Sequence, residues 1–302
     1  MRVITHSDFD GLVCGILLTQ IFRPEYILIT EPNQLRDGKI KLTKEDIVAD
    51  LPIPSTEVFM AFDHHSSVSK EKIEGEWFIL DPKAPSCARV IYDTYKKEYP
   101  AIKIWEDLVK YCDKIDSGNI SMAEYMDKNP YNKVSLTLSS FDRDLDKFYI
   151  QYLIKKALEL KSFEKLSQTD WVEGRYKYRQ YSIKKWKEVV GKYVKSENGI
   201  LIVDIRNAEE FIPKGDSWEL NRVYLDCKVI INITQNREKE ALVSMYENMF
   251  NKKNNAHLGD IAARYGGGGH KGAAGFSLKP DIADETIKEV IKEIRGINKD
   301  GQ

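Results

Sequence analysis

The chain has 302 residues, of which 42% are hydrophobic and 31% are charged, a composition typical of a globular protein and unlike that of a disordered chain. This length favours two domains over one compact core. The formal net charge of −1 excludes a whole-molecule attraction to nucleic acid, so any basic surface must be local.

The four cysteines are far apart in the sequence and form no Cys-x-x-Cys pair. This spacing favours reduced structural thiols over a disulfide framework or a zinc knuckle, and it predicts a cytoplasmic location. The longest apolar stretch near the start, residues 11–22, is far too short for a membrane span. No basic segment precedes it, so we expect no signal peptide.

Short apolar runs bounded by turn or charged residues predict five buried strands in the first part of the chain. Helical segments alternate with them, and their limits are marked by Pro24, Pro85 and Pro100. This alternation predicts an α/β fold over residues 1–143, with a doubly wound, mostly parallel sheet. The predicted strands are 2–5, 26–30, 46–49, 57–62 and 77–80, and the predicted helices are 11–22, 86–97 and 101–114.

Residues 144–197 show helical spacing and no strand pattern, which predicts a helical connector with its second helix over 171–193. Between residues 155 and 195, twelve Lys or Arg residues stand against five Asp or Glu residues, with Trp and Tyr interleaved. Basic and aromatic residues together suit a single-stranded oligonucleotide. A solvated helix face whose aromatic side chains pack inward explains the same pattern at least as well.

Strand patterns return after residue 197, so residues 198–302 are expected to form a smaller C-terminal α/β domain. The glycine run Gly266–Gly269 lies within it and is followed by His270 and Lys271. It precedes a strand and follows a helix, the reverse of a dinucleotide-binding fingerprint, and no P-loop ending closes it. A backbone without Cβ atoms can bring N–H groups close to an anion, so we interpret the run as a phosphate-binding segment; a flexible turn is the alternative. The predicted strands are 199–203, 228–233, 240–245 and 274–278, and the predicted helices are 258–265 and 282–295.

Clusters of Asp and His follow several of the predicted elements in the first domain. In an open parallel sheet the carboxyl ends of the strands form the ligand-binding edge, so we expect these clusters to meet. Each one alone would have an ordinary explanation, such as a helix cap or a turn. Carboxylates mixed with imidazole suit Mn²⁺ or Mg²⁺, which predicts a pair of metals acting on phosphate. The clusters are His6, Asp8 and Asp10 after the first strand, Asp50 after the third, Asp63, His64 and His65 after the fourth, and Asp113 and Asp116 at the end of a helix.

Taken in this order, these motifs resemble the DHH/DHHA1 phosphoesterase superfamily over nearly the whole chain, in particular its nanoRNase and exopolyphosphatase-related branch. The superfamily includes single-strand DNA exonucleases, nanoRNases, 3′-phosphoadenosine 5′-phosphate phosphatases, cyclic-nucleotide and cyclic-dinucleotide phosphodiesterases, and polyphosphatases. The segments that carry the resemblance are 5–11, 48–50, 62–65, 116–118 and 265–276.

The resemblance implies two Mn²⁺ ions, with Mg²⁺ as an alternative, and Asp50 as their bridging ligand. Asp63 would orient His64, and His65 would face the substrate phosphate. Asp113 competes with Asp116 as a ligand, and the Asp-Ser-Gly context favours Asp116. The implied ligands are His6, Asp8, Asp10, Asp50, His64 and Asp116, and the implied substrate-binding residues are Gly268, Gly269 and His270.

Two positions depart from the pattern of that superfamily. One residue separates His6 from Asp8, where the nanoRNase and phosphatase branch has three. Tyr246 stands where many members place a phosphate-binding Arg. Recognition of a terminal phosphate by an arginine at this position is therefore not expected here.

The resemblance implies a Mn²⁺-dependent phosphodiesterase that hydrolyses short oligonucleotides from an end to 5′-mononucleotides. Two metals about 3.5–4 Å apart would generate the attacking hydroxide and stabilise the leaving oxygen. The alternatives are a cyclic mono- or dinucleotide phosphodiesterase, a polyphosphatase, and a nucleotide-binding module with an inactive metal site. We expect a short oligonucleotide or nucleotide phosphate as the partner and no membrane; a homodimer is compatible with the sequence.

Overall fold

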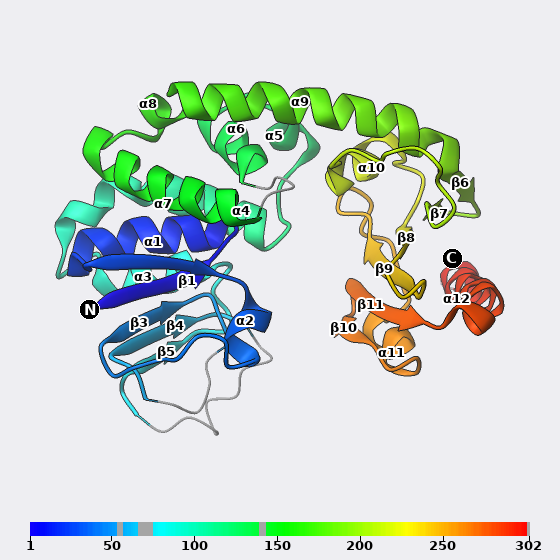
Figure 1. The fold of residues 1–302 in the computed structure, drawn as a ribbon, viewed down its shortest axis with the longest axis horizontal. Helices are drawn as coiled ribbons and strands as arrows, with labels where there is room; N and C mark the ends of the chain where they lie inside the picture. The colour runs from blue at the N-terminus through cyan, green and yellow to red at the C-terminus, as the bar shows by residue number, and fades with distance from the viewer. Residues whose placement is uncertain (53–56, 66–74, 139–142, 301–302) are drawn as a thin grey trace. The chain divides into compact units, whose positions relative to one another are not determined.

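The structure is a computed structural model that describes residues 1–52, 57–65, 75–138 and 143–300 (Figure 1). Its contacts divide the chain into a first unit, Met1–Arg179, and a second unit, Gln180–Gln302. Helix α9 (Asp170–Val190) continues from one unit into the other. Most of the sequence-predicted connector thus belongs to the first unit by its contacts, and the separate role of that segment stays a prediction.

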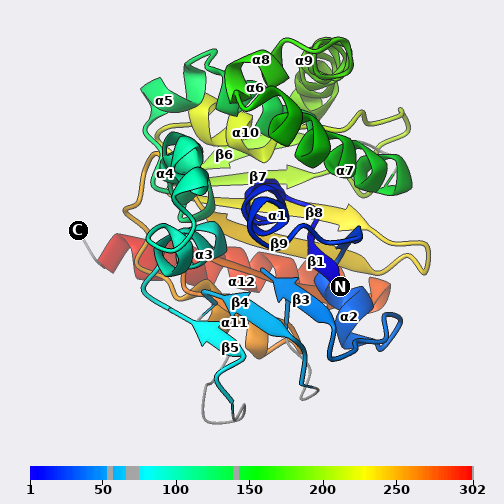
Figure 2. The same ribbon diagram turned by 90° about the vertical axis from the view of Figure 1, so that its left-hand side faces the viewer.

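The first unit is built on a sheet of five strands in the order β2-β1-β3-β4-β5. All four neighbouring pairs are parallel, as the sequence predicted. Helices α1, α3, α4 and α7 lie on one side of this sheet (Figures 1 and 2). The strands are β1 (Arg2–His6), β2 (Tyr26–Thr30), β3 (Asp46–Ala49), β4 (Met60–Asp63) and β5 (Phe78–Leu80).

Both faces of this sheet are buried, which explains why its strands are nearly continuous apolar runs. Ile4, Val48 and Ala61 lie in register on neighbouring strands and pack in one cluster with Leu35 of α2 (Pro32–Arg36). Thr5 points to the opposite face, toward the α1 helix. The sheet therefore holds the ends of its strands in fixed register, which is what a site at their carboxyl edge requires.

The helices predicted in the first unit lie close to their expected limits, whereas the short helices α2, α5, α6 and α8 were not predicted. The Asp8 side chain caps α1 by accepting the N–H of Gly11, and Arg23 ends it in the left-handed region just before Pro24. The predicted helix 101–114 is wrong in its first turn, which is a 3-10 helix in which the N–H of Ile102 donates to the carbonyl of Tyr99, three residues back. The helices here are α1 (Phe9–Phe22), α3 (Cys87–Tyr95), η2 (Pro100–Trp105), α4 (Glu106–Asp116), α5 (Met122–Met126), α6 (Pro130–Thr137), α7 (Arg143–Leu160) and α8 (Phe163–Ser167).

The tryptophans of the predicted connector pack against other parts of the protein. The Trp171 ring lies 4.7 Å from the ring of Tyr152, centroid to centroid. Trp186 packs against Gly215 and against an apolar cluster of the second unit. Trp171, Tyr178 and Tyr181 nevertheless have 37%, 50% and 61% of their surfaces exposed. The interpretation in which the aromatics pack inward therefore holds for Trp186 and only in part for the other aromatics of α9.

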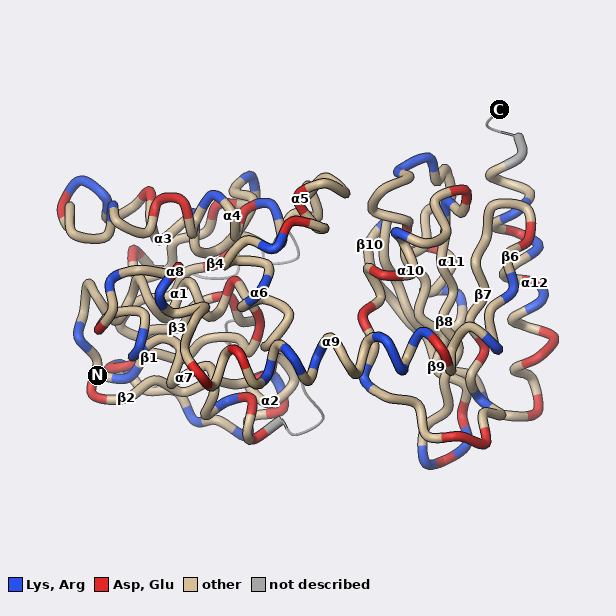
Figure 3. The backbone as a smooth tube through the Cα atoms, turned by 90° about the horizontal axis from the view of Figure 1, so that it is seen from above, with Lys and Arg blue, Asp and Glu red and all other residues tan. Residues whose placement is uncertain are grey.

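Basic residues predominate along the middle of α9, and acidic residues lie near its two ends (Figure 3). Lys185 Nζ lies 2.8 Å from Glu188 Oε2, and Lys187 Nζ lies 2.8 Å from Glu219 Oε2. A local excess of basic residues in the sequence is thus partly neutralised by ion pairs in the structure. Surface pairs of this kind are weak, but they reduce the positive potential available to a polyanion.

The second unit contains a mixed sheet of six strands in the order β10-β11-β9-β8-β7-β6. Two of its strands were not predicted: β6 is a polar, largely exposed edge strand, and β10 is formed by the glycine run itself. Neither has the apolar alternation by which a strand is found in a sequence. The elements are η3 (Gly191–Tyr193), β6 (Val194–Glu197), β7 (Ile200–Asp204), α10 (Ser217–Val223), β8 (Val229–Gln235), β9 (Ala241–Glu247), α11 (Leu258–Ala263), β10 (Gly268–His270), β11 (Ala273–Leu278) and α12 (Pro280–Asp300).

Gly11 allows α1 to begin directly against the end of β1. A Cβ at this position would lie 2.2 Å from the carbonyl oxygen of His6, a backbone atom that cannot move without displacing the strand. We expect Gly11→Ala to destabilise the protein by about 1–3 kcal/mol, measured by chemical denaturation. Gly174→Ala in α9 is the control, because a Cβ there meets nothing within 4 Å. Equal stability of the two variants would contradict the close approach of α1 to β1.

Candidate metal-binding active site

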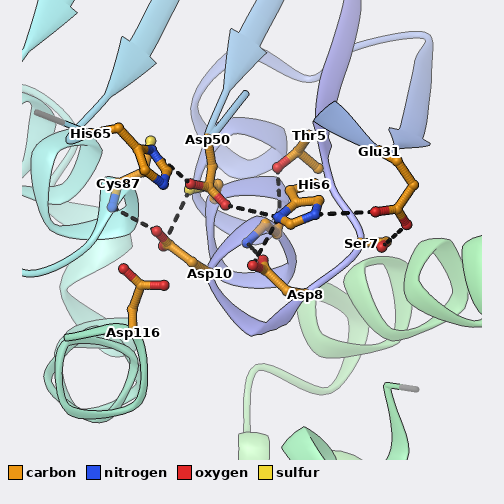
Figure 4. Close-up of polar contacts among 12 residues, drawn as sticks. Thr5, His6, Ser7, Asp8, Asp10, Glu31, Asp50, His65, Cys87 and Asp116 are labelled. Atoms are coloured by element: carbon orange, nitrogen blue, oxygen red, sulfur yellow. Dashed lines mark hydrogen bonds and ion pairs between the residues drawn. The ribbon is translucent and has the colours of Figure 1, made fainter. Parts of the chain in front are cut away.

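The acidic and imidazole side chains meet at the carboxyl edge of the first sheet, beside β1 and β3. These strands are neighbours, whereas β2 lies on the other side of β1, so the chain order changes direction between them. Such a switch point leaves a crevice in which open α/β sheets bind ligands. His6 ends β1, Asp50 follows β3, and both point into this region together with Asp116 (Figure 4).

Asp50 holds a strained backbone conformation at the centre of the site. Its φ of 58° places a non-glycine residue in the left-handed region, which aspartate tolerates better than most residues. Its side chain is almost fully buried, and its N–H donates to the carbonyl of Phe62 at 3.1 Å. Burial raises the pKa of the Asp50 carboxyl, and the negative charges of Asp8 and Asp10 raise it further. Strain and charge concentrated at one residue point to a functional role.

His6 lies between carboxylates. Its Nδ1 is 2.8 Å from Asp8 Oδ2 and 3.6 Å from Asp50 Oδ2. Burial lowers the pKa of His6, but hydrogen bonds to Asp50 and Asp8 outweigh this effect and bring the pKa to about 11. The imidazole thus lies in a strongly negative potential of the kind that also attracts a metal cation.

Asp10 is held in place by the N-terminus of α3. Its two carboxylate oxygens accept the N–H groups of Cys87 at 2.7 Å and Ala88 at 2.8 Å. The Cys112 thiol donates to Oδ1 as well, at 3.3 Å. Burial, together with the charges of Asp116 and Asp8, still raises the pKa of Asp10 to about 7. Sequence reasoning missed these amide donors, because Cys87 lies 77 residues from Asp10 in the sequence.

His64 and Asp116 face each other across the site. His64 Nε2 lies 3.1 Å from Asp116 Oδ2 and 4.0 Å from Asp10 Oδ2. This nitrogen is buried, yet within the described part of the chain its geometry gives it no hydrogen bond. The other ring nitrogen, Nδ1, lies 3.2 Å from the carbonyl of Ala84. A buried imidazole nitrogen aimed at two carboxylates, without a hydrogen bond, is the arrangement expected of a metal ligand.

The alternative carboxylate, Asp113, points elsewhere. It lies 2.6 Å from the guanidinium of Arg89 and accepts the hydroxyl hydrogen of Ser86 at 2.7 Å. Both contacts connect α4 to α3, so Asp113 helps to hold these two helices together. Asp116 is the carboxylate that the structure brings to the cluster.

Asp63 contacts the two histidines differently from the expectation. Its Oδ1 lies 2.7 Å from Nδ1 of His65 and accepts the backbone N–H of His64 at 2.7 Å. The expected ring contact between Asp63 and His64 is absent, because the His64 ring turns toward the carbonyl of Ala84. Asp63 therefore orients the His65 ring directly and His64 only through the backbone.

Three overlapping sets of side chains could hold divalent metal ions. In each set the ligand atoms of three residues lie within 4.8 Å of one another. Asp50 and His64 each belong to two sets, as bridging or central ligands would. The position of the His64 nitrogen and the crowding of carboxylates fit a cation, because positive charge would relieve the repulsion between the carboxylates. The sets are His6, Asp8 and Asp50; Asp10, His64 and Asp116; and Asp50, His64 and His65.

A cavity of about 290 Å³ opens beside these residues. It lies at the small end of the range for ligand pockets, roughly 300–1,000 Å³. Two prolines form part of its wall, beside the polar groups. The lining residues are His6, Asp8, Pro32, Asp50, Pro52, Asp63, His65 and Asp116.

Gly268, Gly269 and His270 form β10 in the second unit, and all three are exposed. A Cβ at Gly269 would lie 2.3 Å from the carbonyl oxygen of Ala273, and its φ is 144°, so the fold itself requires glycine there. A Cβ at Gly268 would meet nothing within 4 Å. Tyr246 is partly buried and accepts a hydrogen bond from Asn232 at 3.1 Å. The substrate-binding role of this segment stays a prediction.

Comparisons with known proteins agree with this architecture. Residues 224–296 match the family model of the DHHA1 domain. The structure is similar to the pGpG-specific phosphodiesterase PggH from Vibrio cholerae, with a TM-score of 0.81 and 26% identity over 98% of this chain and 99% of that chain. No curated protein matches the chain by sequence.

Two more distant structures share the fold. An exopolyphosphatase-related protein from Bacteroides fragilis is 13% identical, with a TM-score of 0.57 over 99% of this chain and 93% of that chain. RecJ from Thermus thermophilus, solved with Mn²⁺, is 14% identical, with a TM-score of 0.55 over 97% of this chain and 51% of that chain.

Residues 224–296 thus match a DHHA1 domain, and the structural neighbours of the whole chain lie in the DHH superfamily. Together these findings indicate a phosphoesterase. None of the helices that the structure describes has both the length and the apolar character needed to cross a membrane.

Replacing Asp50 should weaken metal binding at both candidate sets to which Asp50 belongs. We expect Asp50→Asn to lower the Mn²⁺ content of the purified protein toward zero, because two cations would lose the carboxylate between them. Asp46→Asn is the matched control: Asp46 is a buried carboxylate at the opposite end of β3, where it pairs with Arg2 at 2.7 Å. Metal analysis should show normal Mn²⁺ in this control despite a lower stability. Full Mn²⁺ occupancy in Asp50→Asn would contradict the assignment.

Substitutions of the two carboxylates of α4 should have different effects in the same metal analysis. Asp116→Asn should reduce bound Mn²⁺, because Asp116 faces His64 at 3.1 Å. Asp113→Asn should instead lower the melting temperature, because it weakens the contact with Arg89, and it should keep the metal. The reverse order of effects would identify Asp113 as the ligand.

Proposed function

We propose that this protein is a Mn²⁺-dependent phosphodiesterase that hydrolyses short linear oligonucleotides, dinucleotides above all, to 5′-mononucleotides. The observation that carries the proposal is the match, over nearly the full length of both chains, to a phosphodiesterase whose name gives pGpG as its substrate. That compound is a linear dinucleotide with one phosphodiester bond between its nucleosides. The Bacteroides fragilis protein, at 13% identity, supports the fold and gives no argument for polyphosphate.

Two Mn²⁺ ions would be held by the sets that share the crevice. His6, Asp8 and Asp50 would hold one ion, and Asp10, His64 and Asp116 the other, with Asp50 reaching both. When bound, such a pair of ions supplies an activated water and stabilises negative charge on the phosphate and on the leaving oxygen. Carboxylate and imidazole ligands without thiolate support Mn²⁺ or Mg²⁺ over a softer metal. The metal identity is part of the proposal.

His65 would bind the substrate phosphate. Its side chain is half exposed and lines the cavity. The hydrogen bond to Asp63 raises the pKa of His65, although burial opposes this, so the ring is more readily a cation near neutral pH. With Nδ1 held by Asp63, Nε2 is the nitrogen that can donate to a phosphate oxygen. The contact with Asp63 would keep the His65 ring in this orientation.

The small cavity supports a substrate that enters by its end. About 290 Å³ accommodates a phosphate with part of a nucleotide, whereas a duplex would find no groove among the residues that line it. In the second unit, Gly268 and His270 are separately proposed as substrate-binding residues. Gly268 suits this role, because its missing side chain is not required by the fold.

The test is a product profile in Mn²⁺ and after chelation with EDTA. The panel contains pGpG, pApA, tri- and tetranucleotides, a cyclic dinucleotide, a cyclic mononucleotide, 3′-phosphoadenosine 5′-phosphate and polyphosphate. We expect 5′-mononucleotides from the linear substrates, with the highest kcat/KM for a dinucleotide, and no turnover in EDTA. Faster cleavage of the cyclic compounds or of polyphosphate would replace this proposal with the corresponding alternative.

Substitutions in β10 should weaken substrate binding and leave metal binding unchanged. We expect Gly268→Ala to raise KM for a dinucleotide at least several-fold, because a methyl group would stand where the substrate approaches the backbone. His270→Ala should do the same, and both variants should keep wild-type Mn²⁺ content. Gly296→Ala is the control, since a Cβ at this exposed position of α12 also meets nothing within 4 Å. An unchanged KM in both β10 variants would exclude this segment from the substrate site.

A further inference from the structure

Glu31 is an acidic residue beside the site to which sequence reasoning gave no role. It directly follows β2, and Thr30 at the end of β2 lies in register with His6 at the end of β1. Its carboxylate therefore reaches the same edge of the sheet as the proposed metal ligands (Figure 4). The signal in the sequence was its position: like Asp50 and Asp63, it stands at the carboxyl end of a parallel strand.

The two nitrogens of His6 face opposite surroundings. Nδ1 points to Asp8 and Asp50, the carboxylates of one candidate metal set. Nε2 lies 3.3 Å from Oε2 of Glu31. The ring thus stands between the metal set on one side and a single carboxylate on the other (Figure 4). A metal can bind only through the nitrogen that faces its other ligands, which here is Nδ1.

The Glu31 side chain makes its contacts with His6 and with the residue next to it. Although its backbone stands at the N-cap position of α2, its side chain makes no capping hydrogen bond there. Its Oε1 instead accepts the hydroxyl hydrogen of Ser7, the residue next to His6. Glu31 is part-buried, with 29% of its side chain exposed, so this carboxylate is held rather than freely solvated. An ordinary helix cap or a surface ion pair would not show this pair of partners.

We infer that Glu31 is a positioning residue that accepts the Nε2–H of His6 and thereby presents Nδ1 to the metal. Metal-bound histidines commonly donate their other N–H to a carboxylate, which fixes the tautomer and the ring orientation and makes the ligand more basic. Ser7 holds the carboxylate of Glu31 in turn. The inference rests on the proposed metal-dependent function, and it concerns the one predicted ligand whose spacing departs from the related branch.

The first test is the affinity for Mn²⁺ without substrate, measured by isothermal titration calorimetry. Glu31→Ala should weaken one binding event about 10–100-fold. Glu31→Gln should lose less, because its amide oxygen can still accept the Nε2–H, and Ser7→Ala should also lose less. The matched control is Glu25→Gln, an exposed carboxylate at the opposite end of β2, which should bind Mn²⁺ as the wild type does. Unchanged affinity in Glu31→Ala would overturn the inference.

The second test reads the tautomer directly and does not depend on whether a variant folds. In the wild-type protein loaded with diamagnetic Zn²⁺, long-range ¹H–¹⁵N correlation spectra should show His6 protonated at Nε2 and metal-bound at Nδ1. Metal binding through Nε2 would overturn the inference. Failure of the proposed function looks different: wild-type protein would then bind no Mn²⁺, or would bind it and leave every dinucleotide intact.

Discussion

Repulsion among crowded carboxylates, of which Asp10 and Asp50 are buried, is the constraint on which the site of this protein depends. Asp8, Asp10, Asp50 and Asp116 converge at one edge of a parallel sheet, where burial and mutual repulsion hold the pKa values of Asp10 and Asp50 above their usual range. Such a concentration of charge is unfavourable unless cations or donors offset it. The surrounding structure supplies donors, notably the N–H groups of α3 for Asp10, and among the described residues it gives His64 Nε2 no hydrogen bond. The fold therefore creates a deficit of positive charge that metal cations would offset.

Several features of this arrangement followed from the sequence because they depend on local patterns. Apolar runs located every strand of the first sheet, and the rule that parallel strands share a carboxyl edge brought His6, Asp50 and His64 together. The choice of Asp116 over Asp113 agrees with the contacts of both side chains, although their roles stay predictions. The family assignment, made from the order of the motifs, is confirmed by the DHHA1 match and by the similarity to PggH.

Other features depend on tertiary contacts that no local pattern records. The ring partner of Asp63 is His65, because the His64 ring turns to a carbonyl 20 residues away. Glu31 is brought to His6 by the pairing of β1 with β2, 25 residues apart in sequence. The strands β6 and β10 lack apolar alternation, since one is a polar edge and the other is made largely of glycine. In each case long-range geometry decides a contact between residues whose own sequence neighbourhood is uninformative.

The metal-ligand candidates all come from the first unit, whereas the DHHA1 match and the exposed glycine segment belong to the second. Mutations in the second unit can thus accumulate without touching a single ligand of the metals. If the second unit binds the substrate, as we propose, the substrate can change there while the candidate metal ligands of the first unit stay the same. The same architecture occurs in an exonuclease and in a pGpG-specific phosphodiesterase, as the similarities to RecJ and PggH illustrate.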